Sequence, residues 1–206
     1  RLVGRGHDVR VLSRGRNGPF PDIADHVETL GISLHDEDGL AAAMQGMDCV
    51  FNLAKSTDKS WQAALENDVA TTERIGRAAI RAGVGRLVHT GTIASYDMSD
   101  PARTITEATG FGAMDSRNIY ARSKAEGERR LIAMQAQGLR LAIARPGIVL
   151  GDGGPLQHWG IGRWHGAGAV RLWGNGRNIL PFVLADDVSD GLIAMIPGVL
   201  AVVFFG

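Results

Sequence analysis

Short apolar runs alternate with helical patterns along this chain, and this alternation constrains the fold more than any other feature. The runs with strand character are residues 9–12, 48–54, 86–90 and 139–144. The segments with helical spacing are residues 38–45, 61–82 and 120–137. Strands joined by long helical crossovers pair in parallel, with helices on both faces of the sheet. The pattern therefore predicts an α/β fold with a doubly wound parallel sheet.

The residues that follow the strands predict where a ligand binds. In an open parallel sheet, ligands bind beyond the carboxyl ends of the strands. These ends are Leu12, Leu53, His89 and Ala144, and polar or turn-forming residues follow them. We therefore expect the functional residues just after these positions.

The composition limits the classes of partner. Lys plus Arg and Asp plus Glu each number 22, so the formal net charge is zero and favours neither nucleic acid nor an anionic membrane surface. No stretch approaches the roughly 20 apolar residues that cross a bilayer. The single cysteine, Cys49, allows no intrachain disulfide, which fits a reducing compartment. We expect a cytoplasmic protein that acts on a small-molecule substrate, with no nucleic acid, membrane or metal.

The character of the sequence changes after residue 150. Glycines become frequent, and Trp159, Trp164 and Trp173 lie among them. We predict a sheet domain over residues 1–150 and a partial substrate-facing region over residues 151–206, of which 181–206 returns to the sheet. The apolar tail at residues 199–205 has the length of a buried strand.

Tyr120 and Lys124 form the pair with the clearest chemistry. Four residues apart on a helix, they share one face. A tyrosine with a pKa near 10 is a poor base at neutral pH, and a nearby cation lowers that pKa by stabilising the phenolate. Thr92 follows the strand at 86–90 and offers a hydroxyl to a substrate oxygen. The three side chains together could polarise a C–O group and move its proton.

The order of these motifs resembles the extended short-chain dehydrogenases/reductases, the NAD-dependent epimerase/dehydratase family. The segments that carry the resemblance are 6–12, 50–54, 67–71, 90–96, 120–124, 145–151 and 181–188. The resemblance implies a Rossmann-type NAD(P)-binding fold with Thr92, Tyr120 and Lys124 as the catalytic triad. It also implies a set of cofactor-binding residues, namely Leu53, Ala54, Lys55, Asn67, Tyr120, Lys124, Pro146 and Ile148. A homodimer formed through the helix at 120–137 is a further implication.

The start of the chain departs from the family pattern. The family opens with a strand and a glycine-rich turn that brings a pyrophosphate to a helix N-terminus. Residues 2–5 resemble the end of that helix, so we expect the first strand and the turn to lie before Arg1. The glycine string at 160–166 is not that turn, because it follows no clear strand.

The end of the second strand predicts the cofactor. Ser13 and Arg14 stand where an acidic residue would select NAD, and a hydroxyl followed by guanidinium groups suits a 2′-phosphate. We expect NADP in preference to NAD. Ser33 and Leu34 correspond to the family's adenine-binding segment, with Ser33 in place of its aspartate.

Three functions remain open. The leading hypothesis is an epimerase/dehydratase-like oxidoreductase acting on a nucleotide-sugar, with Arg177 as a substitute for the family's diphosphate-binding arginine. Ile93 and Ala94 follow Thr92 where dehydratases carry Asp-Glu, which favours an epimerase or reductase. The second is an NADPH-dependent ketone reductase similar to dihydroflavonol reductases or hydroxysteroid dehydrogenases. The third is a non-catalytic NADP-sensing protein, although such proteins usually lose the tyrosine or the lysine.

Overall fold

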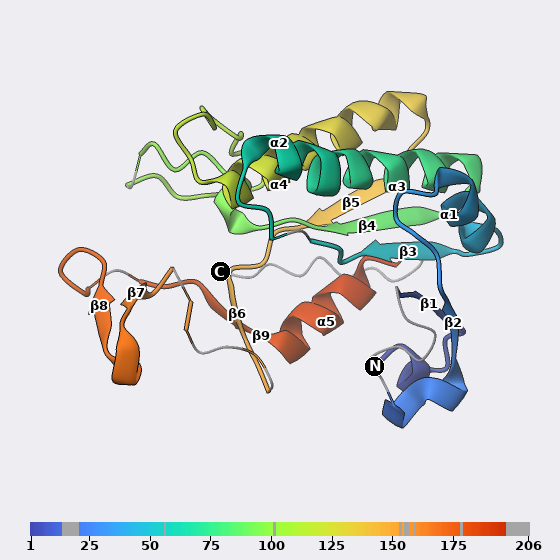
Figure 1. Cartoon of the computed structure of the whole chain (residues 1–206), viewed down its shortest axis with the longest axis horizontal. Helices are drawn as coiled ribbons and strands as arrows, with labels where there is room; N and C mark the ends of the chain where they lie inside the picture. The colour runs from blue at the N-terminus through green and yellow to red at the C-terminus, as the bar shows by residue number, and fades with distance from the viewer. Residues whose placement is uncertain are drawn as a thin grey trace.

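A parallel sheet of three strands lies at the centre of the computed structural model (Figure 1). The structure describes residues 1–13, 21–55, 57–100, 102–152, 154, 157–158, 160–177 and 179–196. The strands run in the order β3 (Cys49–Asn52), β4 (Arg86–Thr90) and β5 (Leu141–Ala144). Their register sets Asn52 beside His89 and His89 beside Ile143, so the carboxyl ends of the three strands form one edge.

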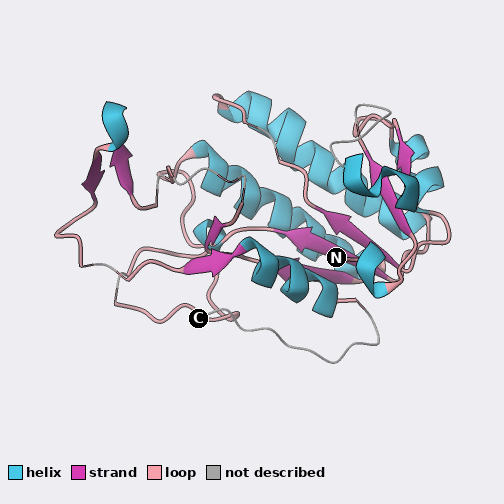
Figure 2. Cartoon of the chain, turned by 90° about the horizontal axis from the view of Figure 1, so that it is seen from below, coloured by secondary structure: helices cyan, strands magenta, loops and turns pink. Residues whose placement is uncertain are grey.

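Helices cover both faces of this sheet. The helices α3 (Ala70–Arg81) and α4 (Ile119–Met134) lie on one face, and α5 (Ala185–Ala194) lies on the other (Figures 1 and 2). At the end of α5, the Met195 carbonyl accepts a hydrogen bond of 3.2 Å from the Arg86 guanidinium. The predicted doubly wound arrangement is confirmed.

The core lies between the sheet and its helices. The helix α1 (Glu37–Met44) begins at Asp36, whose side chain accepts a hydrogen bond from Gly39 N and caps the first turn. It packs through Leu40 and Met44 against the apolar stripe of α3. The buried cluster consists of Leu40, Ala41, Met44, Ile75, Ala78, Ala79, Val84, Leu87, Leu131, Met134 and Leu139.

The helix expected over residues 61–82 is interrupted. It consists of α2 (Trp61–Ala64), a π-helical turn (Leu65–Val69) and α3. Within the turn, the Ala70 N–H donates to the Leu65 carbonyl five residues back, the hydrogen-bond pattern of a π-turn. A π-turn inserts one residue into the helical repeat, and here Asp68 and Val69 become buried while Asn67 stays exposed.

Six further strands form three small sheets. The strand β1 (Val9–Leu12) pairs in parallel with β2 (Val27–Leu30), and no hydrogen-bonded ladder joins this pair to β3 within the described residues. The strand β6 (Ile148–Leu150) pairs in parallel with β9 (Phe182–Leu184), across the domain boundary expected at residue 150. The strands β7 (Gly162–Trp164) and β8 (Val170–Leu172) form an antiparallel hairpin. The sequence did not predict β2, β6, β7 or β8 as strands, whereas β9 lies in the segment 181–206 that was expected to return to the sheet.

Short 3-10 helices complete the described elements. They span Val3–Arg5, Pro21–His26, Ile93–Ser95, Gln135–Gln137 and Gly166–Gly168. The glycine string at 160–166 runs through β7 and opens no α-helix, as expected. No helix in the described part of the chain combines the length and apolar character that crossing a membrane requires. The tail at 199–205, expected to be a strand, lies outside the described residues.

The acidic residues Asp186 and Asp187 do not cap α5. Both residues lie in its first turn, and Leu184 occupies the N-cap position without a side-chain hydrogen bond. The two charges still favour the positive end of the helix dipole. Asp186 also pairs with Arg1 at 2.9 Å.

Candidate active site

Thr92, Tyr120 and Lys124 meet at the carboxyl edge of the central sheet. Thr92 follows β4, and its side chain lies near enough to the Tyr120 phenol to act on the pKa of that group. Tyr120 lies in the first turn of α4, which begins where the Asn118 side chain accepts a hydrogen bond of 2.8 Å from Ala121 N. Lys124 lies one turn later on the same helix. Helical spacing therefore places Tyr120 and Lys124 on one face of α4, and the fold brings Thr92 to the same edge of the sheet.

Lys124 is held by two oxygens from other elements. Its Nζ donates to the Ala54 carbonyl at 3.2 Å, just beyond β3, and to Asp68 Oδ1 at 3.4 Å. The Lys124 and Asp68 side chains are only 5% and 6% exposed, so this is a buried ion pair. Ser123 Oγ donates to the second oxygen of Asp68 at 2.7 Å. Both carboxylate oxygens of Asp68 thus contact α4.

The surroundings of Tyr120 act against ionisation of its phenol. Burial raises the pKa of Tyr120 most, the neighbouring Thr92 side chain lowers it, and the charges of Asp68 and Glu128 raise it, so the pKa lies above its ordinary value. The sequence predicted a pKa lowered by Lys124, and this direction is wrong. The main physical reason is that the phenol is buried, and the charges of Asp68 and Glu128 act in the same direction.

A second buried ion pair fixes the turn that carries Thr92. Glu128 is fully buried, and its two oxygens accept hydrogen bonds from Ser95 Oγ at 2.7 Å and Arg145 Nε at 2.6 Å. Gly91 passes so close to Glu128 that a Cβ at this position would overlap the carboxylate. The Arg145 guanidinium also stacks over the Tyr96 ring, 4.4 Å from its centroid. This network ties the turn after β4 to the helix that carries Tyr120.

A buried histidine lies beneath this edge of the sheet. His89 is 1% exposed, and its Nδ1 lies 3.1 Å from Asn52 Nδ2. Asn52 Oδ1 accepts from Ala54 N at 3.1 Å, which orients the amide so that its nitrogen faces the ring. Burial, followed by the charges of Lys124 and Arg145, lowers the pKa of His89 to about 3. His89 is therefore neutral at physiological pH.

A cavity of about 210 Å³ opens beside Tyr120. Its lining comes from the loop after β3, from α2 and from the start of α4: Lys55, Thr57, Asp58, Ala64, Ile119, Tyr120 and Ser123. Asp58 Oδ2 is buried without a hydrogen-bond partner among the described residues. This cavity has the position expected for a substrate or cofactor group next to the phenol.

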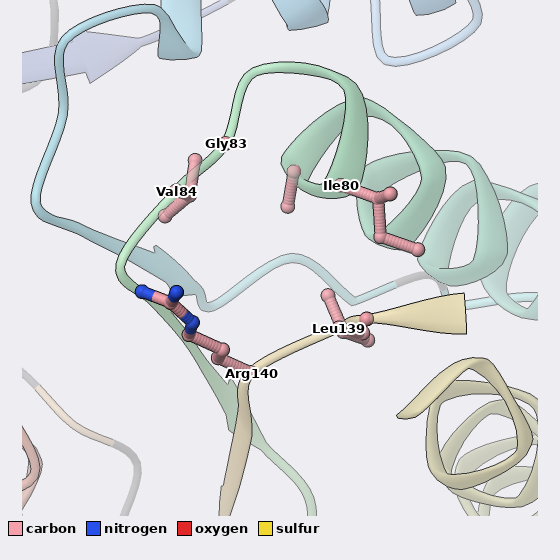
Figure 3. Close-up of a pocket in the computed structure, with 7 residues that line it drawn as sticks. Ile80, Gly83, Val84, Leu139 and Arg140 are labelled. Atoms are coloured by element: carbon pink, nitrogen blue, oxygen red, sulfur yellow. The ribbon is translucent and has the colours of Figure 1, made fainter. Parts of the chain in front are cut away.

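A second cavity, of about 100 Å³, lies at the opposite edge of the sheet. Figure 3 shows Ile80 and Leu139 facing each other across it, with Val84 and Arg140 on its other side. These residues belong to the end of α3 and to the segments that enter β4 and β5. The cavity is remote from Tyr120 because it adjoins the amino ends of the strands.

The residues expected around the nicotinamide half of the cofactor lie at the same edge as Tyr120. Leu53 and Lys55 are exposed just after β3, Leu53 with 62% of its surface free. The Pro146 carbonyl accepts a hydrogen bond of 3.2 Å from Ile93 N, next to Thr92. Ile148 is buried at the start of β6, and its backbone N–H donates to the Pro181 carbonyl at 2.8 Å. Its side chain contributes packing to this edge.

The residues expected at the adenosine end lie beside β1 and β2. Ser13 follows β1, and its backbone N–H donates to the Leu30 carbonyl at 3.0 Å. Arg14 lies outside the described residues. Ser33 is exposed and its Oγ accepts from His35 N at 3.2 Å, while Leu34 packs against the core cluster.

Two further predicted residues lie apart from the triad. Asn67 is exposed, and its Nδ2 donates to Asp58 Oδ1 at 3.1 Å, so it supports the cavity wall while its neighbour Asp68 contacts Lys124. Arg177 is exposed in the turn after β8, where its backbone N–H donates to Asn175 Oδ1. Figure 1 shows that the β7–β8 hairpin projects away from the central sheet.

The sequence analysis missed three residues of this site. Glu128 carried a signal, since it lies four residues after Lys124 and continues the helical face of Tyr120 and Lys124. Asp68 and Arg145 carried none, because their roles arise from contacts between segments distant in the sequence.

The model of the NAD dependent epimerase/dehydratase family matches residues 1–200. The chain belongs to this family. Its similarity to a 2-alkyl-3-oxoalkanoate reductase of Stenotrophomonas maltophilia is 26% identity over 201 residues, 91% of this chain and 57% of the relative. A 3 beta-hydroxysteroid dehydrogenase/Delta 5-->4-isomerase of Mycobacterium tuberculosis is 26% identical over 74% of this chain and 43% of its own length. The chain thus spans about half the length of the curated relatives it matches.

Solved structures of this family share the fold. A dTDP-glucose 4,6-dehydratase from Streptomyces venezuelae, with NAD bound, is 25% identical and superposes with a TM-score of 0.70 over 93% of this chain and 63% of that one. A UDP-glucose 4-epimerase from Thermotoga maritima, with UDP-glucose bound, is 15% identical with a TM-score of 0.72 over 95% of this chain and 67% of that one. The Rossmann-type fold expected from the sequence is confirmed.

Proposed function

We propose that this member of the epimerase/dehydratase family is an NAD(P)-dependent oxidoreductase that interconverts a secondary alcohol and its ketone. The observation that carries the proposal is that Thr92 lies near enough to the Tyr120 phenol to act on its pKa, with Lys124 one turn along the same helix. A hydroxyl donor, a proton carrier and a cation at one edge of a parallel sheet are the groups that this chemistry needs.

The carboxyl edge of the sheet suits a nicotinamide cofactor. Leu53 presents an apolar side chain there, next to the Ala54 carbonyl that binds Lys124. An ammonium group has three N–H donors, and the described residues accept from Lys124 at Ala54 and Asp68, which leaves a donor for a ribose hydroxyl. When bound, NAD(P) supplies the hydride acceptor or donor. Leu53, Ala54, Lys55 and Pro146 would lie near its ribose and nicotinamide.

The protein's own groups would handle the proton. In the reducing direction, Thr92 Oγ1 donates to the carbonyl oxygen, and Tyr120 Oη gives that oxygen its proton as the carbon receives a hydride. In the oxidising direction, the Tyr120 phenolate takes the hydroxyl proton as the carbon loses the hydride. Lys124 holds the cofactor ribose and orients the first turns of α4.

The names of the curated relatives support a ketone or alcohol outside the sugar nucleotides. They include reductases and dehydrogenases of oxoalkanoates, sterols and dihydroflavonols, each 24–26% identical to this chain. Arg177, the residue expected to bind a diphosphate, is exposed in a turn after the projecting hairpin. No contact among the described residues brings it to Tyr120, which agrees with a substrate outside the sugar nucleotides.

One observation favours a nucleotide-sugar substrate as a second candidate. The cavity beside Tyr120 carries polar and charged groups from the loop after β3, namely Lys55, Thr57 and Asp58. Such a lining suits the hydroxyl groups of a sugar. Solved structures that hold sugar nucleotides also superpose on nearly the whole chain.

Turnover assays with purified protein separate these hypotheses. Stoichiometric oxidation of NADPH by a ketone such as a 3-oxoalkanoate or 3-oxosteroid supports the first, whereas conversion of UDP-glucose without net NAD(P)H consumption supports the second. Tyr120→Phe should lower turnover by at least about 100-fold and leave cofactor binding intact, because general acid–base catalysis contributes about that factor or more. Tyr96→Phe is the matched control and should retain most of the turnover. Cofactor binding without turnover of either substrate class in the wild-type protein would instead indicate a sensor.

A further inference from the structure

Asp68 is a buried carboxylate that contacts two residues of α4, Lys124 and Ser123. The π-turn Leu65–Val69 directs it inward, where one carboxylate oxygen pairs with Lys124 at 3.4 Å and the other accepts from Ser123 at 2.7 Å. A continuous α-helix would have no residue inserted at this point of the repeat. The deviation from the α-helix and the buried carboxylate therefore occur together.

A buried carboxylate at this position changes the electrostatics around the phenol. Lys124 Nζ sits between Asp68 Oδ1 and the Ala54 carbonyl, so its charge is balanced on the side away from solvent. The phenol itself also faces other charged groups, from α4 and from the loop after β3. Among the described residues, these groups are Lys124 and Glu128 on α4, Asp68 on the π-turn, and Lys55 and Asp58 on the cavity wall.

We propose that Asp68 is a positioning residue that holds the Lys124 ammonium against the end of β3 and disfavours the phenolate form of Tyr120. The effect is Coulombic, because a carboxylate disfavours a phenolate nearby and also offsets the cation that would favour it. This inference rests on the proposed function, and it has a kinetic consequence. Donation of a proton to a ketone does not depend on Asp68 at neutral pH, whereas oxidation of the alcohol, which needs the phenolate, is displaced to higher pH.

The direct test titrates the phenol without substrate. The chain has two tyrosines, Tyr96 and Tyr120, so ultraviolet difference spectra recorded across alkaline pH show the ionisation of only two phenols. The transition that is lost in Tyr120→Phe belongs to Tyr120. Asp68→Asn should move that transition to lower pH. The matched control is Asp115→Asn, which removes the same charge from a carboxylate that is 93% exposed and paired with Arg122, and which should not move it.

Turnover gives an independent readout. In Asp68→Asn, the acid limb of the pH profile for alcohol oxidation should shift to lower pH together with the spectroscopic transition. A merely structural role would lower the rate at every pH without this shift. Asp68→Glu, which keeps the charge, should restore the wild-type profile.

The outcomes distinguish this inference from the proposed function. An unchanged or higher Tyr120 transition in folded Asp68→Asn overturns the inference, even if the protein turns over a ketone. A lowered transition in a protein that turns over neither substrate class supports the inference about Asp68 and refutes the proposed function. If Asp68→Asn does not fold, Asp68→Asn/Lys124→Gln is compared with Lys124→Gln. A transition in the double variant that is not lower than in Lys124→Gln also overturns the inference.

Discussion

Mild acid should destabilise this protein through His89, which is buried beneath the active-site edge. Burial lowers the pKa of His89 from 6.5 to about 3, with the charges of Lys124 and Arg145 acting in the same direction. Above pH 6.5 neither the folded nor the unfolded state protonates this ring. Between pH 6.5 and 3 the unfolded state binds a proton that the folded state does not, so stability falls as the pH falls.

The size of the effect follows from the difference between the two pKa values. A shift from 6.5 to about 3 corresponds to on the order of 5 kcal/mol at full protonation of the unfolded state. At about pH 5, which lies roughly 1.5 units below the unfolded pKa, the loss is about 2 kcal/mol. That is a substantial part of the 5–15 kcal/mol that typically stabilises a domain, so the change is readily measured.

Denaturant unfolding at neutral pH and at about pH 5 measures this loss in the wild type and in His89→Gln. Other groups also titrate in this interval, so the informative quantity is the difference between the two proteins. The variant should lose about 2 kcal/mol less than the wild type on acidification, whatever its stability at neutral pH. His35→Gln, at an exposed histidine, is the control and should behave as the wild type. Equal losses in the wild type and His89→Gln would refute the argument from burial.

Two further predictions concern an ion pair and the cofactor. Glu128→Gln leaves Arg145 without its charged partner in a buried site and should lower the free energy of unfolding by about 3–5 kcal/mol. Asp38→Asn, in an exposed pair with Arg81, should lower it by less than about 1 kcal/mol. Chemical denaturation compares the two variants, and similar losses of stability would contradict the distinction between a buried and an exposed pair. Arg14→Ala should weaken NADP binding more than NAD binding in calorimetric titrations, because the proposed contact is with the 2′-phosphate, and an equal loss for both cofactors would remove the basis for preferring NADP.

The sequence predicted the elements whose signal is local. The strand at 86–90 was predicted with the bounds that the structure shows, and the helix carrying Tyr120 and Lys124 begins one residue earlier than expected. The strand β2 was missed because four residues that include Glu28 give little alternation. The π-turn was missed because its residues fit a helical repeat as well as their neighbours do.

The site likewise contains features that the sequence determines and features that only the fold determines. The spacing of Tyr120 and Lys124 is a property of one helix, so the sequence by itself determined that they share a face. The partner of Lys124 lies 56 residues away at Asp68, and that of Glu128 lies 17 residues away at Arg145. Only the tertiary structure decided these pairings.

The direction of the Tyr120 pKa shows what this difference means physically. Sequence spacing places a cation near the phenol and predicts a lowered pKa, while the fold buries the phenol and adds the charges of Asp68 and Glu128, which raise it. The period of a helix is set by backbone geometry within a few residues, and it can be read from the chain. The net charge around a buried group is a sum over all segments that meet there, and it exists only once they have packed together.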